Sequence, residues 1–343
     1  MERTDQTSEM INTTNITLRP AQMQDAEEVA SLINICAQLY TGQDEIDRNI
    51  LESHWTSPDF DIENDSIVAE NTDGKIIGAA NAWDSDPFVK VYIRDSIHPS
   101  YASNDVTAMI DDWINERSLA TMAKAPADAK VTLITSVVDT DEKSRARHEA
   151  NGFQINRYFQ RMIIEVDHEL PNPSLPQGIE IKPMRKAELL PAVAHTVRNA
   201  FRDHYGHVER PFENELLDWQ HWIETDENVD LDLWYIAWDG DEVAGVSLCM
   251  PKMPEDDQMG WVEVLGVRRR WRRQGIALAL LHHSFIELQK LCVARVGLGV
   301  DAASLTKATE LYRKAGMHPD RTFVSYERVL REGVDYTTQK LES

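Results

Sequence analysis

The feature that most restricts the fold of this chain is an internal repeat, because the same order of sequence signals occurs twice. The paired markers are the strand starts at 16–20 and 179–183, the hairpin turns at Asp73-Gly74 and Asp239-Gly240, and the helix ends at Gly152 and Gly316. Glycine after aspartate is typical of tight hairpins, and a repeat on this scale predicts two similar domains rather than one large one.

Each copy reads as strand, helices, hairpin, strand, helix, strand, helix and strand, which predicts an α/β domain with a mixed (α+β) sheet. In the second copy we expect strands at 233–238, 243–250, 260–267, 294–300 and 322–330, and helices at 274–290 and 304–315. Three prolines between the copies predict a stiff connector. The predicted boundaries are a flexible tail at 1–15, domains at 16–168 and 179–330, a Pro-rich linker at 169–178, and a C-terminal tail at 331–343.

Charge and composition narrow the classes of function. The 343 residues include 35 Lys and Arg against 58 Asp and Glu, a net charge of −23 that opposes nucleic-acid or anionic-membrane binding and favours a small cationic partner. Cys36, Cys249 and Cys292 are too far apart in sequence to indicate a disulfide framework or a zinc site. No segment approaches the roughly 20 apolar residues of a membrane span, and the polar start lacks signal-peptide character. We expect a cytoplasmic protein without a metal.

A basic turn before an amphipathic helix carries the clearest chemistry. Residues 267–277 read Val-Arg-Arg-Arg-Trp-Arg-Arg-Gln-Gly-Ile-Ala. Gly275 permits close backbone approach, and the free N–H groups at a helix N-terminus suit a phosphate or pyrophosphate. The glycines of a dinucleotide fingerprint and the Gly-Lys-Ser/Thr of a P-loop are both missing. The alternative interpretation is an ordinary helix start with an exposed basic run.

Two motifs resemble one family. The pattern Arg272-x-x-Gly275-x-Ala277, after a strand that ends at Val267, resembles the acyl-coenzyme A pyrophosphate loop of the GNAT superfamily of N-acetyltransferases. The later segment with Leu311-Tyr312 and Gly316-Met317 resembles the final helix of the same family. The doubled layout is similar to mycothiol synthase-like members. The resemblance implies two tandem GNAT-like domains, acetyl-coenzyme A as co-substrate, and a primary amine as acceptor.

The resemblance also assigns the coenzyme contacts. The pantetheine arm would lie beside the strand that ends at Val267, whose backbone N–H would stabilise the oxyanion of the acyl group. The family usually has Asn where this chain has Ser304. The coenzyme-binding residues implied are Leu265, Val267, Arg272, Arg273, Gln274, Gly275, Ile276, Ala277 and Ser304.

Two residues are candidates for proton transfer. By resemblance, Tyr312 protonates the departing thiolate; a phenol of pKa ~10 donating to a thiol of pKa ~8.5 is uphill by only about 2 kcal/mol. Glu263 alternates with Trp261, Leu265 and Val267, which predicts that they share one strand face. The resemblance implies a base, or a residue that holds a base water, on this strand, so Glu263 is the candidate base for an alkylammonium acceptor. Alternatively, Tyr312 is a half-buried helix aromatic, and Glu263 pairs with the substrate cation or is simply solvated.

A further region is expected to cover the acceptor pocket. By analogy with tandem members, it contains His204-Tyr205-Gly206-His207 and then Trp219 and Trp222, whose rings are candidates to hold a cationic amine. The spacing of the two tryptophans is also typical of core packing.

The first copy is predicted to lack a coenzyme site. Its alignment places Ala102 at the position of Arg272, Asp105 at that of Gly275, and Thr107 at that of Ala277. A carboxylate about 4 Å from a pyrophosphate costs on the order of 4 kcal/mol even at an effective dielectric constant of 20. His148 replaces the tyrosine, a change that is not decisive because histidine can also donate a proton. We therefore expect a structural role for this copy.

Three functions are compared on this basis. The leading hypothesis is an N-acetyltransferase that acts on a primary amine of a small cationic molecule by direct attack in a ternary complex. The second is a non-catalytic acyl-coenzyme A sensor or scaffold. The third, a nucleic-acid patch formed by residues 268–273, is opposed by the net charge of −23. The sequence leaves the acceptor, the length of the acyl chain and the oligomeric state open.

Overall fold

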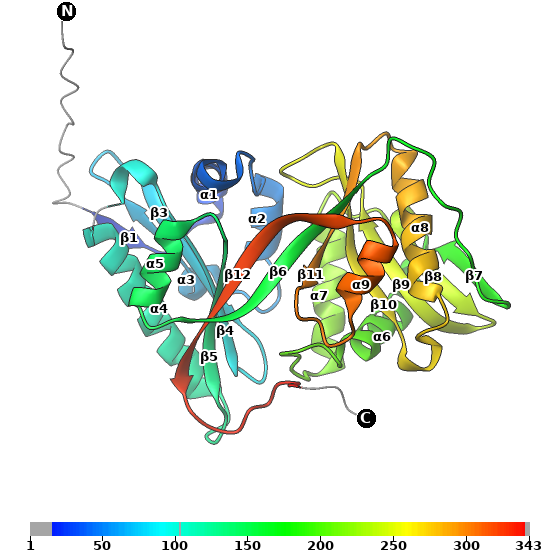
Figure 1. The fold of residues 1–343 in the computed structure, drawn as a ribbon. Coiled ribbons are helices and arrows are strands. Elements are labelled where there is room, and N and C mark those ends of the chain that lie inside the picture. The colour runs from blue at the N-terminus through cyan, green and yellow to red at the C-terminus, as the bar shows by residue number, and fades with distance from the viewer. Residues whose placement is uncertain (1–15, 103, 340–343) are drawn as a thin grey trace, which may run out of the picture.

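A continuous mixed sheet of twelve strands runs through the molecule, with helices against both of its faces (Figure 1). The computed structural model describes residues 16–102 and 104–339, so the predicted tail at 1–15 and the last residues, 340–343, lie outside the described residues. The strand order is β1-β2-β3-β4-β5-β12-β6-β11-β10-β9-β8-β7. The predicted α/β fold with a mixed sheet is confirmed.

The elements follow the predicted order in both halves. In the first half they are β1 (Thr17–Arg19), α1 (Ala26–Thr41), α2 (Arg48–Trp55), α3 (Ile62–Asp65), β2 (Ser66–Glu70), β3 (Ile76–Asp84), β4 (Lys90–Ile97), α4 (Asn104–Lys124), β5 (Val131–Val138), α5 (Glu142–Ala150) and β6 (Gln154–Glu165). In the second half they are β7 (Ile179–Pro183), α6 (Leu190–Phe201), α7 (Phe212–Thr225), β8 (Trp234–Asp239), β9 (Glu242–Met250), β10 (Met259–Val267), α8 (Ile276–Gln289), β11 (Arg295–Asp301), α9 (Ala308–Lys314) and β12 (His318–Arg331).

The centre of the second half is buried from both sides. In β9 every residue after Glu242 is buried, because α6 packs on one face of the sheet and α8 on the other. Alternate strand residues therefore enter two separate cores. Val246 and Leu248 join the cluster near α6, whereas Cys249 joins the cluster near α8. Ala244 also joins the cluster near α8, because the register of β9 against β8 shifts at this residue.

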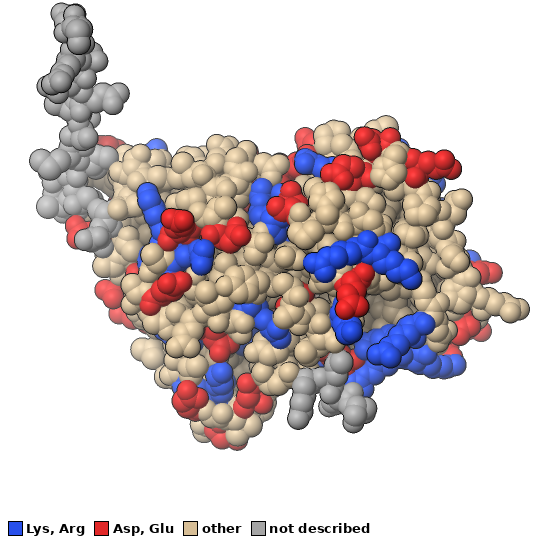
Figure 2. All heavy atoms as spheres, in the orientation of Figure 1, with Lys and Arg blue, Asp and Glu red and all other residues tan. Residues whose placement is uncertain are grey.

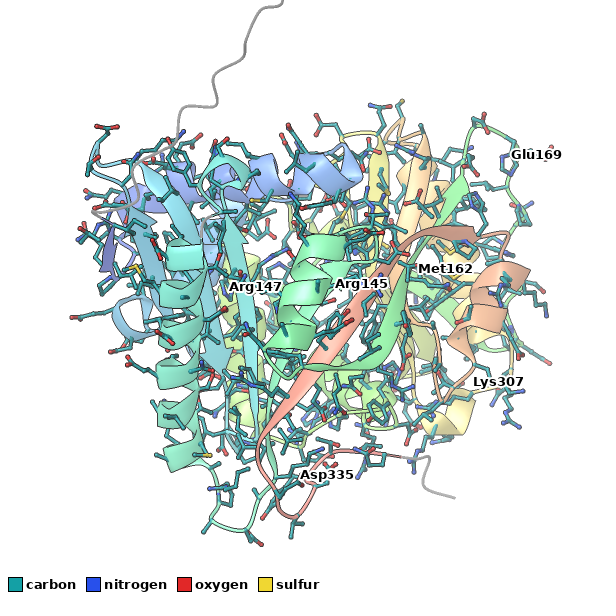
Figure 3. The ribbon with its side chains drawn as sticks, turned by 60° about the vertical axis from the view of Figure 1, so that its left-hand side comes forward. Arg145, Arg147, Met162, Glu169, Lys307 and Asp335 are labelled. Atoms are coloured by element: carbon teal, nitrogen blue, oxygen red, sulfur yellow. The ribbon has the colours of Figure 1, made fainter. Side chains whose placement is uncertain are left out.

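The final strands of the two halves are exchanged. β6 belongs to the first half by sequence, yet it lies between β11 and β12, and β12 lies between β6 and β5. Met162 of β6, labelled in Figure 3, is consequently fully buried in the core below α8. Tyr326 of β12 is fully buried in the core of the first half. The boundaries 16–168 and 179–330 follow the order of the elements and stay a prediction.

The helix before β12 is shorter than expected. We predicted it at 304–315, but α9 begins at Ala308. Lys307 has a φ of 60° in the left-handed region, which a right-handed helix cannot include. The preceding residues form turns instead, in which Ser304 donates its N–H to Asp301 and Lys307 donates to Ser304.

The segment after β12 connects both halves. Val334 exchanges backbone hydrogen bonds with the 128–130 turn of the first half, and Thr338 does the same with residues 206–207 of the second. Asp335 marks this segment in Figure 3. In residues 16–102 and 104–339, no helix has both the length and the apolar composition required to cross a bilayer.

Candidate active site

A cavity of about 1540 Å³ lies where the two halves meet, and both of them line it. The first half contributes α1, the end of β4 and part of β5; β6 and β12 cross the floor; the second half contributes β10, β11 and the starts of α8 and α9. Among the sequence-predicted site residues, those that line the cavity are Glu263, Leu265, Val267, Arg272, Arg273, Gly275, Ile276, Ala277, Ser304 and Tyr312. Gln274 is exposed in the same loop.

The turn before α8 has the shape of an anion cradle. Gly275 has a φ of +89° and directly precedes the helix. The first hydrogen bond of the helix is donated by Ala279 to the Gly275 carbonyl, at 3.0 Å. The amides of residues 276–278 therefore donate to no carbonyl within the helix, and they point out of its positive end. This geometry matches a phosphate or pyrophosphate.

Arg272 supports this turn from behind. Its guanidinium donates to the carboxylate of Asp203 at 2.6 Å and to the carbonyls of Ala200 and Val267, each at 3.0 Å. Asp203 is only 2% exposed. Hydrogen bonds from Arg269 and then from Arg272 lower the pKa of its carboxyl to about 2, so this carboxyl stays ionised. Arg272 would thus contribute to a coenzyme site by holding the turn before α8 in place through these hydrogen bonds.

Several arginines of the basic run have partners within the chain. Trp271 is buried, and Arg268 and Arg270 lie over its ring, with 5.0 and 4.7 Å from each guanidinium carbon to the ring centre. Arg269 and Arg272 are bound to Asp203. On the face drawn in Figure 2, basic side chains gather over α9 and the start of α8, beside the anion cradle.

A gap opens between β10 and β11 next to this turn. The two strands pair in parallel only as far as Trp261 and Gly297, and then diverge. On the other side of β10, Arg268 donates its N–H to Ala244 of β9. Because antiparallel bonding alternates along a strand, the backbone groups of Leu265 and Val267 point away from β9 and into the gap. An extended thioester arm fits beside such an open strand edge.

Glu263 is the extra residue of a β-bulge. The register of β10 against β9 shifts between Val262 and Val264, which leaves Glu263 without a strand partner. Bulges near functional sites redirect a side chain. The bulge also corrects one expectation: Trp261 faces the α6 side of the sheet, whereas Leu265 and Val267 face α8, so these four residues do not share a single face.

The Glu263 carboxylate opens on the cavity and accepts a hydrogen bond from the Trp261 indole N–H at 2.8 Å. Protein surrounds most of the cavity, and this desolvation raises the pKa of Glu263, while the bond from Trp261 acts in the opposite direction. The indole lies across β11, where a Cβ at Gly297 would stand 2.7 Å from the ring. Sequence reasoning missed this pair, although two glycines in the strand 294–300 are a signal that a large neighbour covers it.

Tyr312 extends from α9 to the cavity wall. The residue is 8% exposed, and among the described residues its hydroxyl has no hydrogen-bond partner. Burial raises the pKa of Tyr312 to about 12, so the phenol keeps its proton at neutral pH. Ser304 lies at the rim, where its hydroxyl contacts Thr306 at 3.0 Å. Figure 3 shows Lys307 in the same turn, at the start of α9.

The residues predicted to cover the acceptor pocket lie in two different places. His204 and Tyr205 line the cavity, and burial lowers the pKa of His204. Tyr205 stacks under Arg157 of β6, with 3.6 Å from the guanidinium carbon to the ring centre. Trp219 and Trp222 instead contact the fully buried Trp234. These contacts favour the alternative that the two tryptophans pack in the core.

In the first half, two ion pairs bridge the elements that correspond to β10, α8 and α9. Arg147 of α5 reaches Asp95 of β4 and Asp111 of α4. Figure 3 shows Arg147 on the β4 side of α5, away from Arg145. His148, which corresponds to Tyr312, is 3% exposed and packs against Phe153 away from the large cavity. In the described residues, no group of three or more His, Cys, Asp or Glu side chains is arranged to hold a metal ion.

Comparison with known proteins agrees with this geometry. Residues 194–317 match the Acetyltransferase (GNAT) family. None of the curated protein sequences matches the chain. A GCN5-related N-acetyltransferase from Sphaerobacter thermophilus is 27% identical, with a TM-score of 0.75, over 93% of this chain and 97% of that one.

Two more distant structures share the fold. A tandem GNAT protein from the clavulanic acid biosynthesis pathway is 14% identical, with a TM-score of 0.68, over 93% of this chain and 99% of that chain. N-myristoyltransferase from Saccharomyces cerevisiae, solved with myristoyl-CoA, is 11% identical, with a TM-score of 0.62, over 95% of this chain and 79% of that chain. Residues 194–317 thus match an acetyltransferase domain of the GNAT family, and the chain as a whole is similar to a GCN5-related N-acetyltransferase and shares its fold with a tandem GNAT protein.

Proposed function

We propose that the chain transfers an acetyl group from acetyl-coenzyme A to the primary amine of a small cationic molecule, by direct attack in a ternary complex in the cytoplasm. The observation that carries this proposal is the continuity of the site. The open edge of β10 leads to the free amides of α8, and Glu263 and Tyr312 line the same cavity. A binding site without turnover needs neither of these two proton-transfer groups in this position.

Each group has one task in the reaction. The amides at 276–278 hold the pyrophosphate, and the backbone of Leu265 and Val267 binds the extended arm. Glu263 takes a proton from the ammonium, and the free amine then forms its bond to the acetyl carbon. As the carbon–sulfur bond breaks, Tyr312 gives its proton to the thiolate. The nitrogen loses its second proton as the amide forms, and this proton restores the Tyr312 phenol through solvent, while Glu263 releases the first proton to solvent. The products are the N-acetylated amine, coenzyme A and one proton.

The test is release of free thiol from acetyl-coenzyme A in the presence of a panel of primary amines. We expect release with at least one small amine, at a rate well above hydrolysis of the thioester without amine. Coenzyme A binding is measured in parallel by calorimetry. Tight binding with no thiol release across the panel would favour the sensor or scaffold instead.

Replacing Tyr312 with phenylalanine is expected to lower kcat about a hundredfold, since general acid catalysis contributes on that order. Coenzyme binding should stay within a factor of two or so, because the hydroxyl has no hydrogen-bond partner among the described side chains. Single-turnover rates with saturating amine measure the effect. An unchanged rate would assign Tyr312 to packing alone.

Replacing Trp261 with phenylalanine is expected to move the acidic limb of the kcat/KM profile to higher pH. The indole hydrogen bond lowers the pKa of Glu263, so its loss raises that pKa, and the basic form then appears only at higher pH. The matched control is Tyr92→Phe in β4, the corresponding strand of the first half, which should leave the profile in place. A limb that does not move would separate Glu263 from the rate.

We further propose that only the second half binds the coenzyme. Arg147 bridges Asp95 of β4 and Asp111 of α4, and Asp95 stands at the level of Leu265. Breaking such a partly buried network leaves charges without partners, so it opens at a cost of several kcal/mol. One coenzyme per chain is the expected stoichiometry by calorimetry.

A further inference from the structure

Arg321 and Glu263 lie near opposite ends of one cavity floor. The sheet register pairs Arg321 of β12 with Arg161 of β6, and Arg161 with Gly299 of β11, so all three lie on one face. The Trp261 indole covers Gly299 and binds Glu263. Three strand spacings, about 14 Å in total, separate β12 from β10, the strand that carries Glu263. A ligand whose reacting nitrogen lies at Glu263 therefore extends toward Arg321.

The two arginines of this floor differ in their partners. Arg161 is bound by two carboxylates, Glu255 at 2.9 Å and Asp320 at 2.5 Å. Arg321 donates to the neutral side-chain oxygen of Gln43 at 2.8 Å, and no described carboxylate lies within 4.0 Å of its guanidinium. Desolvation and the charge of Arg161 lower the pKa of Arg321, while the more distant charges of Asp320 and Glu255 act in the opposite direction.

The other acidic groups near this end of the cavity are already engaged. Glu45 pairs with Arg94, and Asp44 accepts a hydrogen bond from Gln38. The half-buried Arg321 thus has no carboxylate of the described chain in direct contact, although Asp320 and Glu255 act on it from further away, and the residue lines the cavity. A guanidinium binds a carboxylate through two parallel hydrogen bonds, and such charge-assisted bonds are about twice as strong as neutral ones.

The floor next to the arginines is aromatic. Phe159 of β6 and Phe323 of β12 are paired in register, each two residues from its arginine, so they face the same side. Both rings line the cavity, and Phe159 is 40% exposed. Exposed aromatic rings beside an unpaired cation suit a ligand with an apolar body and an anionic end.

We propose that the acceptor is a carboxylate-bearing amine, amino-acid-like in character, whose carboxylate is bound by Arg321. Its amine lies at Glu263, its apolar body rests on Phe159 and Phe323, and its carboxylate supplies the missing counter-ion. The ammonium end keeps the positive charge that the acidic chain favours. This inference rests on the proposed acetyl transfer and adds the substrate class to it.

The experiment compares each ω-amino acid with its amide, from 3-aminopropanoate to 8-aminooctanoate, together with 4-(aminomethyl)benzoate and its amide. With acetyl-coenzyme A and thiol release as the readout, we expect a KM for the best carboxylate about 10- to 100-fold below that of its amide. Arg321→Met should remove this preference, and Arg321→Lys should keep part of it because the charge remains without the planar fork.

The control is Arg328→Met on the same strand. Its guanidinium donates to the Asn151 carbonyl and to the Asn115 side chain, outside the large cavity. This variant should keep the wild-type preference. Equal KM values for acids and amides in the wild type, or a preference that survives in Arg321→Met, would overturn the inference.

Failure of acetyl transfer itself gives a different result, namely no thiol release with any amine. The anionic subsite is then tested without turnover. With coenzyme A present, calorimetry compares 6-acetamidohexanoate with 6-acetamidohexanamide, which have the shape of acetylated products. Tighter binding of the acid in the wild type but not in Arg321→Met supports the subsite, and equal binding of acid and amide refutes it.

Discussion

Replacing Gly275 with aspartate is expected to weaken coenzyme A binding about a thousandfold. A carboxylate about 4 Å from the pyrophosphate costs on the order of 4 kcal/mol at an effective dielectric constant of 20, which is about three decades in Kd. The φ of +89° at this position adds strain for any side chain. Calorimetric titration with coenzyme A measures the loss directly.

The control for this substitution is Gly74→Asp in the hairpin of the first half. Gly74 has a φ of +76°, and a Cβ there would meet nothing within 4 Å, as is also true at Gly275. It therefore carries similar backbone strain but lies away from the cavity. Gly74→Asp should bind coenzyme A like the wild type. Wild-type affinity in Gly275→Asp would mean that the phosphates bind somewhere other than the start of α8.

Replacing Glu263 with glutamine is expected to lower kcat/KM at neutral pH by about a hundredfold or more, since general base catalysis contributes 10²- to 10⁴-fold. The amide keeps the size of the side chain and can still accept the Trp261 hydrogen bond. The residual rate should rise with pH, because the free amine then forms in solution. A pH series of kcat/KM, with coenzyme binding as a check on folding, measures both effects.

The same variant separates the alternative roles of Glu263. If the carboxylate only attracts the ammonium, KM rises while kcat is retained. If Glu263 is a solvated strand residue, neither parameter changes. Only the base role predicts a lower kcat that is recovered at high pH.

The order of elements could be predicted from sequence because it depends on local signals. The hairpin glycines, the strand that ends at Val267 and the glycine before α8 each act within a few residues. The exchange of β6 and β12 could not be predicted in this way. In a repeated sequence, each final strand fits either core equally well by pattern, so only the tertiary pairing decides between them.

The site shows the same division. The loop at 272–277 was predictable, because a helix N-terminus binds anions through its own backbone. The role of Arg272 was not, because its partner Asp203 is distant in sequence and lies at the end of α6. The period-two rule was wrong for Trp261 and Leu265, since the extra residue Glu263 reverses the faces of the strand after it. Arg321 could not be predicted as a site residue, because its environment depends on tertiary contacts: Asp320 pairs with Arg161, and Arg321 donates to Gln43 instead.

The trading of β6 and β12 gives this chain the topology of a domain-swapped homodimer whose subunits have been fused end to end. In such an arrangement, a half without catalytic activity is still required for folding, because it supplies a strand to the sheet of the other half. If only the second half binds the coenzyme, the half that contains Asp105 contributes shape rather than chemistry.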